Sequence, residues 1–92
     1  MKSEVNRRVV LAEDDSDISD LIEAHLLREG YEVFTTADGA EAINLIASYR
    51  PRVALLDIMM PSATGIEVAQ LIRSSAVYRE TCIVLFSARS TG

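Results

Sequence analysis

The feature that most constrains the fold is an apolar run that carries one acid and ends in a proline, residues 52–61 (RVALLDIMMP). The run is too short to cross a membrane, and its lack of alternation is typical of a strand buried on both faces in the centre of a parallel sheet. Pro61 cannot extend a strand, so the chain must turn there. Asp57 would then lie at the carboxyl end of a central strand, where open α/β sheets place ligand chemistry. Taken alone, Asp57 could equally be an ordinary acid that caps the next helix.

The composition is that of a soluble globular domain. The chain has 92 residues, 49% hydrophobic and 25% charged, and we expect residues 1–92 to form one domain. The net charge of −5 disfavours nonspecific binding to nucleic acid or to an anionic membrane, because both need clustered Lys and Arg. The one cysteine, Cys82, lies in an apolar run, is expected to be a buried thiol, and fits a reducing compartment. With a polar N-terminus and no long apolar stretch, the expected location is cytoplasmic.

Strands and helices are predicted to alternate along the chain. Short β-branched or apolar runs predict three further strands, at Val9–Ala12, Tyr31–Thr36 and Cys82–Phe86. Apolar residues at helical spacing, with capping residues before them, predict three helices, from Asp15 or Ser16 to Gly30, from Asp38 to Arg50, and from Thr64 to about Ser74. The order β-α-β-α-β-α-β favours an α/β fold with right-handed crossovers and a mainly parallel sheet.

Polar side chains end or follow three of the predicted strands. Glu13 and Asp14 follow the first strand, Asp57 ends the third, and Ser87 follows the fourth. Because the carboxyl ends of parallel strands meet at one edge of a sheet, we expect these side chains to converge. Carboxylates held close together repel one another unless a cation joins them, and an all-oxygen ligand set suits Mg²⁺.

The convergence of these groups suggests phosphoryl chemistry. Beside a metal ion, one carboxylate can act as a nucleophile and form an aspartyl phosphate. Asp57 is the candidate because it comes from the central strand, and the hydroxyl of Ser87 could donate a hydrogen bond to a phosphoryl oxygen. The simpler alternative is that residues 13–17 (EDDSD) form a solvated helix-capping cluster. An EF-hand loop, a G-x-G-x-x-G motif and a Walker lysine motif are all missing.

Three motifs in this sequence resemble the receiver domain of two-component response regulators. They are Val9–Asp15, Leu55–Pro61 with Gly65 four residues later, and Leu85–Ala88, and they occur in the family's order and spacing. The resemblance implies a flavodoxin-like, doubly wound parallel sheet with strand order 2-1-3-4-5, of which this sequence would supply 2-1-3-4. It also implies that a histidine kinase or a phosphotransfer protein is the partner.

The resemblance also implies a role for each site residue. Asp57 would be the phosphoacceptor, and Glu13 and Asp14 would join it in binding Mg²⁺ or Mn²⁺. The backbone carbonyl of Met59 would be a further metal ligand, and Ser87 would be the switch hydroxyl. Met59 and Arg89 match the positions that tune dephosphorylation in this family. The implied protein is a signalling phosphoacceptor rather than an enzyme, with at most slow self-phosphorylation and self-dephosphorylation.

The sequence departs from the family after the fourth strand. Receivers continue into a fifth strand that opens with a lysine contacting the phosphoryl group, whereas this sequence stops at Gly92 and its one lysine, Lys2, precedes the first strand. We therefore expect an incomplete receiver with weak phosphotransfer. The run Cys82–Phe86 would be an unprotected apolar edge, which predicts a homodimer or larger assembly through that edge and the uncovered apolar face beside it.

Two functional classes remain open from the sequence. The first is the phosphoacceptor module just described. The second is a truncated or engineered receiver that acts as an interaction or self-assembly module without being phosphorylated. A multiple-turnover hydrolase is disfavoured, because nothing beyond the same acids could activate a water molecule.

Overall fold

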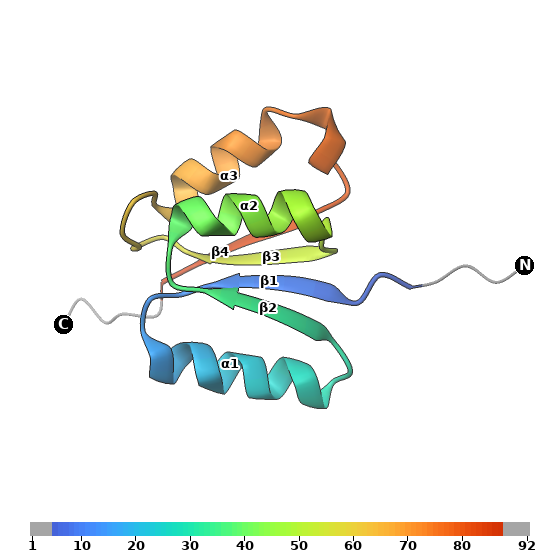
Figure 1. Ribbon diagram of the computed structural model, residues 1–92, viewed down its shortest axis with the longest axis vertical. Helices are drawn as coiled ribbons and strands as arrows, with labels where there is room; N and C mark the ends of the chain where they lie inside the picture. Colours follow the sequence, from blue (N-terminus) through green and yellow to red (C-terminus); the bar gives the residue numbers. More distant parts are fainter. Residues whose placement is uncertain (1–4, 88–92) are drawn as a thin grey trace, which may run out of the picture.

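The fold is a parallel sheet with helices on both faces. A computed structural model of the chain describes residues 5–87. In chain order its elements are β1 (Arg8–Ala12), α1 (Ser16–Arg28), β2 (Glu32–Thr36), α2 (Gly39–Tyr49), β3 (Val53–Asp57), α3 (Gly65–Arg73), the 3-10 helix η1 (Ala76–Tyr78) and β4 (Cys82–Phe86). Helix α1 covers one face of the sheet, and α2 and α3 cover the other (Figure 1). None of the helices in residues 5–87 has the length and apolar character needed to cross a membrane.

The strand order is β2-β1-β3-β4, and all neighbouring strands are parallel. This result confirms the predicted α/β architecture and the order 2-1-3-4. The register of β1 with β3 aligns Ala12 with Leu56. The residue that follows β1 and the last residue of β3 therefore lie level with each other at the carboxyl edge of the sheet.

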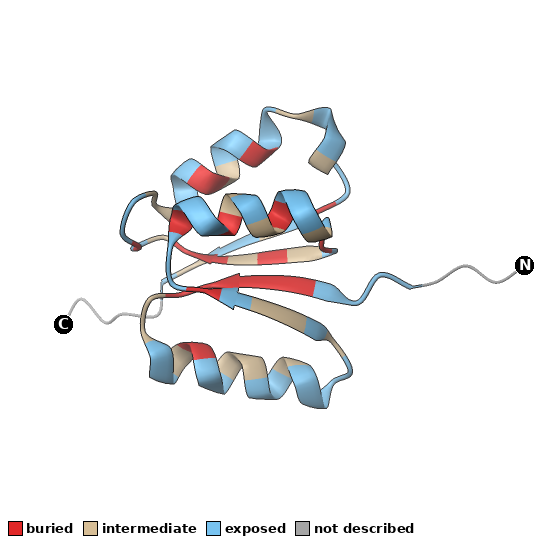
Figure 2. Ribbon diagram, in the orientation of Figure 1, coloured by how far each residue is buried: buried red, intermediate tan, exposed pale blue. Residues whose placement is uncertain are grey.

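The hydrophobic core lies between the sheet and the helices α2 and α3. Its buried side chains come from β1, β3, the loop after β3 and the two helices, and are Val10, Ala12, Ala42, Ile46, Ala54, Leu56, Met60, Val68 and Ile72. Figure 2 shows this burial as red segments on β1, β3, α2 and α3. Strand β3 departs from the prediction of burial on both faces, since Val53 and Leu55 are only half-buried. The reason is that α1 packs mainly against β1 and β2.

The helices begin at the capping residues predicted from the sequence. The carboxylate of Asp15 accepts hydrogen bonds at the start of α1, and that of Asp38 does so at the start of α2. Thr64 and Glu67 form a capping box at the start of α3. Each cap satisfies backbone N–H groups that would otherwise lack partners, so the helix starts are fixed beside the carboxyl edge of the sheet.

Strand β4 is an exposed apolar edge of the sheet. It pairs with β3 on one side, and no strand within residues 5–87 pairs with its other side. Val84 and Leu85 are 41% and 42% exposed, which confirms the expectation of an uncovered apolar strand. The prediction of a buried thiol at Cys82 is wrong, because Cys82 lies on this exposed strand.

Gly65, the first residue of α3, allows the helix to begin against the end of β3. A Cβ atom at this position would lie 2.4 Å from the carbonyl oxygen of Asp57, closer than van der Waals contact allows. We expect Gly65→Ala to lower the free energy of unfolding by about 1–3 kcal/mol, the usual range for overpacking. Chemical denaturation measures this change. The matched control is Ser16→Ala at the exposed first position of α1, expected to change stability by less than about 0.5 kcal/mol. Equal stability of the two variants would contradict the proposed close packing.

Candidate metal centre

Three carboxylates meet at the carboxyl edge between β1 and β3. Glu13 and Asp14 follow β1, Asp57 ends β3, and one carboxylate oxygen from each lies within 4.8 Å of the others. Glu13 and Asp57 are 2% and 0% exposed, and Asp14 is half-buried. The structure therefore brings together the three acids that the sequence predicted to converge. Helix capping accounts for Asp15 but not for Glu13, whose carboxylate is buried at the sheet edge.

Each of the two buried acids has one oxygen held by the backbone and one left over. Oε2 of Glu13 accepts a hydrogen bond from the N–H of Asp15 at 2.9 Å, and Oδ1 of Asp57 accepts one from the N–H of Met59 at 3.0 Å. Among the described residues, the other two oxygens, Glu13 Oε1 and Asp57 Oδ2, are buried without a hydrogen-bond partner. Such oxygens destabilise a fold unless something compensates them, and a hard divalent cation does so. The donor set therefore fits Mg²⁺.

The electrostatics of Glu13 reflect this crowding of acids. The pKa of Glu13 is raised to about 7, mainly by burial and also by the neighbouring carboxyl groups of Asp57 and Asp14, against the lowering effect of the Asp15 N–H. Burial and like charges both disfavour the ionised form of a carboxyl group. Near neutral pH a cation therefore competes with a proton for Glu13.

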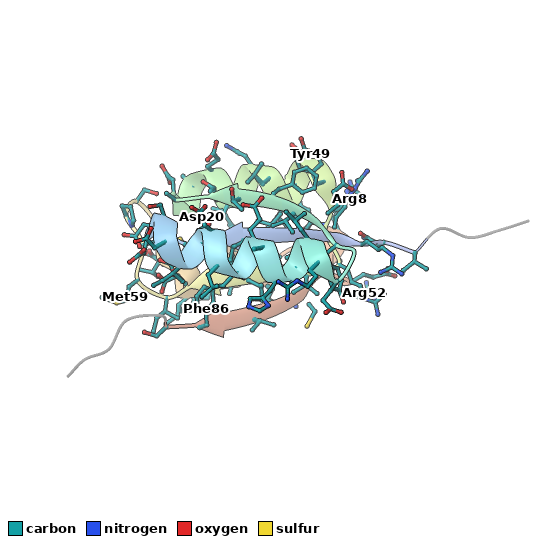
Figure 3. All side chains as sticks on the ribbon, turned by 90° about the horizontal axis from the view of Figure 1, so that it is seen from below. Arg8, Asp20, Tyr49, Arg52, Met59 and Phe86 are labelled. Carbon is teal, nitrogen blue, oxygen red and sulfur yellow. The ribbon has the colours of Figure 1, made fainter. Side chains whose placement is uncertain are left out.

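Two further predicted site residues, Met59 and Ser87, follow the carboxyl ends of β3 and β4. Figure 3 shows Met59 and Phe86 toward one end of the molecule and Arg52 toward the other. The side chain of Met59 is exposed, and so is Ser87, which directly follows β4 and makes no hydrogen bond within the described residues. Arg89 lies outside the described residues. The roles of the Met59 carbonyl, Ser87 and Arg89 stay predictions.

Sequence reasoning missed the contacts that hold the loop between β3 and α3. In this loop Ser62 has a φ of 66° and donates a hydrogen bond from its hydroxyl to Asp38, which is 24 positions away. The sequence placed Ser62 in a loop of small residues and Asp38 at a helix cap. Neither pattern indicated that the two side chains meet.

A hollow of the surface lies away from the acidic site. It is a groove of about 840 Å³ whose lining includes Arg50, Arg52 and Arg79, and none of the three clustered acids lines it. Cavity size therefore does not identify the acidic site, which is recognised by its chemistry.

Comparison with known proteins agrees with this fold. Residues 9–92 match the family described as the response regulator receiver domain. One similar structure is the receiver domain of a sensor histidine kinase from Pseudomonas aeruginosa, with a magnesium ion coordinated in its active site cleft. It is 28% identical to this chain with a TM-score of 0.84, and the match covers 95% of this chain and 71% of that chain. The response regulator TrrA from Thermotoga maritima, in complex with Mg²⁺-BeF, is 34% identical with a TM-score of 0.82, over 91% and 71% of the two chains.

A second structure of TrrA shows that protein in complex with the histidine kinase ThkA, with 34% identity and a TM-score of 0.80 over 91% of this chain and 71% of that one. This chain spans 71% of the length of each of these three solved structures and 65% of the length of another that it matches. The family match begins within β1 and includes all three clustered acids. The chain therefore belongs to the response regulator receiver domain family.

Proposed function

We propose that this chain accepts a phosphoryl group on Asp57, in a Mg²⁺-dependent reaction, from a histidine kinase or a phosphotransfer protein. The observation that carries the proposal is the state of Asp57, which is buried with one oxygen held by the Met59 N–H and the other without a hydrogen-bond partner among residues 5–87. A fixed carboxylate with one available oxygen is suited to nucleophilic attack. The two neighbouring acids, Glu13 and Asp14, supply the remaining carboxylates of a cation site.

The chemistry follows from these groups. Oδ2 of Asp57 attacks the phosphorus atom of a phosphohistidine, the new P–O bond forms as the P–N bond breaks, and the imidazole of the donor leaves with the bonding electron pair. When bound by Glu13, Asp14, Asp57 and the Met59 carbonyl, Mg²⁺ or Mn²⁺ supplies positive charge beside the phosphoryl oxygens. The hydroxyl of Ser87 donates a hydrogen bond to one of those oxygens.

The relatives support this assignment in two respects. One has magnesium in its active site cleft, and another is in complex with a histidine kinase. In this proposal the chain is a signalling module whose self-phosphorylation and self-dephosphorylation are slow, with Met59 and Arg89 tuning the latter. Weak phosphotransfer and a cytoplasmic location stay predictions from the sequence.

We further propose that a second copy of this chain associates with β4. The support is the unpaired outer side of β4 within the described residues, together with the exposure of Val84 and Leu85. Apolar edge strands without a lysine or a proline readily pair with another strand. This surface also supports the second candidate function, an interaction module that works without phosphorylation.

Beryllofluoride, a phosphoryl mimic, separates the two candidate functions. With Mg²⁺ present, we expect it to shift the backbone amide NMR signals around Asp57 and Ser87, because it binds the free oxygen of Asp57 as a phosphoryl group would. Asp57→Asn should abolish these shifts, and Asp20→Asn, which makes the same charge change on the exposed side of α1, should leave them intact. A parent protein whose spectrum does not respond would leave only the interaction module.

The raised pKa of Glu13 predicts that Mg²⁺ binding depends on pH. A proton must leave Glu13 before its carboxylate can bind the cation, so the affinity is fully present above pH 7 and is lost as the pH falls through that value. Titration calorimetry should show affinity about tenfold weaker at about pH 6 than at about pH 8. Glu13→Gln should bind more weakly and lose most of this dependence. A dissociation constant that is the same at both pH values in the parent protein would contradict the raised pKa.

Light scattering over a concentration series tests the association through β4. We expect the average mass to rise with concentration, and Val84→Lys to shift the protein toward the monomer by placing a charge on the exposed strand. The matched control is Ser48→Lys on the exposed side of α2, which should not change the assembly. A monomer mass at all concentrations would refute the second-copy proposal without affecting phosphorylation at Asp57.

A further inference from the structure

The loop between β3 and α3 is held by the first turn of α2. The hydroxyl of Ser62 donates a hydrogen bond to the carboxylate of Asp38 and accepts one from the N–H of Ala40 at 3.2 Å. The N–H of Gly39 donates a hydrogen bond to the carbonyl oxygen of Pro61 at 3.5 Å. Three consecutive residues at the start of α2 therefore bind two consecutive residues of the loop.

The packing between these segments is as close as their backbones allow. A Cβ atom on Gly39 would lie 2.0 Å from the carbonyl oxygen of Ala63, so only glycine permits this approach. Ser62 also has a φ of 66°, which a residue with a Cβ rarely adopts unless its surroundings hold it there. The hydrogen bond from Ser62 also holds the pKa of Asp38 below its usual range, which indicates that Asp38 receives this bond as a carboxylate.

The same loop begins at the acidic site. The N–H of Met59 donates to Oδ1 of Asp57 at 3.0 Å, and the N–H of Ile58 donates to the carbonyl of Phe86 at 2.9 Å. Between Met59 and Ser62 the chain makes no strand or helix hydrogen bonds of its own. This short stretch is held by Asp57 at one end and by α2 at the other, with Met60 between them buried in the core and the N–H of Ala63 donating to the carbonyl of Pro61 at 2.8 Å.

We propose that the contact between Ser62 and Asp38 positions the Met59 backbone for metal binding. Ser62 and Asp38 are then positioning residues of the phosphoacceptor site. The proposal rests on the proposed function, because it needs a cation at the clustered acids. Without the contact, the Met59 N–H would be held less firmly against Asp57, and the Met59 carbonyl would be less often in place as a ligand. Groups that orient metal ligands commonly change affinity by an order of magnitude or more.

The first test compares Mg²⁺ affinity in variants with the contact removed. Ser62→Gly removes the hydroxyl while suiting the positive φ, and Asp38→Ser keeps a good helix cap but is too short to reach Ser62. We expect each to weaken Mg²⁺ binding about tenfold, and the double variant to be no weaker than either, because both remove one interaction. Ser62→Asn, which tolerates positive φ and can donate to Asp38, should bind within about twofold of the parent. The control, Ser48→Ala on α2, should bind as the parent does.

The second test needs no metal. Amide hydrogen exchange at Met59 should be faster in Ser62→Gly than in the parent, with no change at Val10 in the core strand. Equal exchange at Met59 would overturn the positioning role. If the parent protein binds Mg²⁺ and the variants bind it equally tightly, the positioning role alone is overturned. If the parent protein binds no Mg²⁺, the proposed function itself is overturned.

Discussion

The main constraint on the structure is the electrostatic repulsion between carboxylates that the strand register holds close together. The parallel register of β1 and β3 places Glu13 and Asp57 side by side, and Asp14 follows on the same strand end. Water would normally separate such charges, yet two of the three acids are buried. The fold therefore stores an unfavourable interaction at one edge of the sheet, and a divalent cation relieves it. The raised pKa of Glu13 has the same origin, since burial and the neighbouring carboxyl groups favour its protonated form.

Several elements around the site hold its residues in position. The cap of α1 is Asp15, whose carboxylate accepts from the N–H groups of Asp17 and Ile18. The Met59 N–H fixes one oxygen of Asp57, and Gly65 lets α3 begin directly against that residue. On the far side, α2 holds the loop through Ser62. Together these contacts hold the residues around the three acids at the carboxyl edge of the sheet.

Most of the fold and the acid cluster could be predicted because they depend on local patterns. Apolar runs located the strands, capping residues located the helix starts, and the rule that parallel strands end at one edge brought Glu13, Asp14 and Asp57 together. The misses concern tertiary context. Cys82 is exposed on β4, which pairs with a strand on one side only within the described residues, and its apolar sequence does not reveal this edge position. The contact of Ser62 with Asp38 was hidden because a left-handed serine in a loop leaves no periodic signal.

The most direct test of the central claim is a crystal structure with Mn²⁺, located by its anomalous scattering. Mn²⁺ favours the same oxygen ligands as Mg²⁺. The account predicts an anomalous peak within bonding distance of carboxylate oxygens of Glu13, Asp14 and Asp57, with Glu13 Oε1 turned toward the ion. Well-ordered crystals with no peak between these three acids, at a Mn²⁺ concentration that occupies other sites, would contradict it.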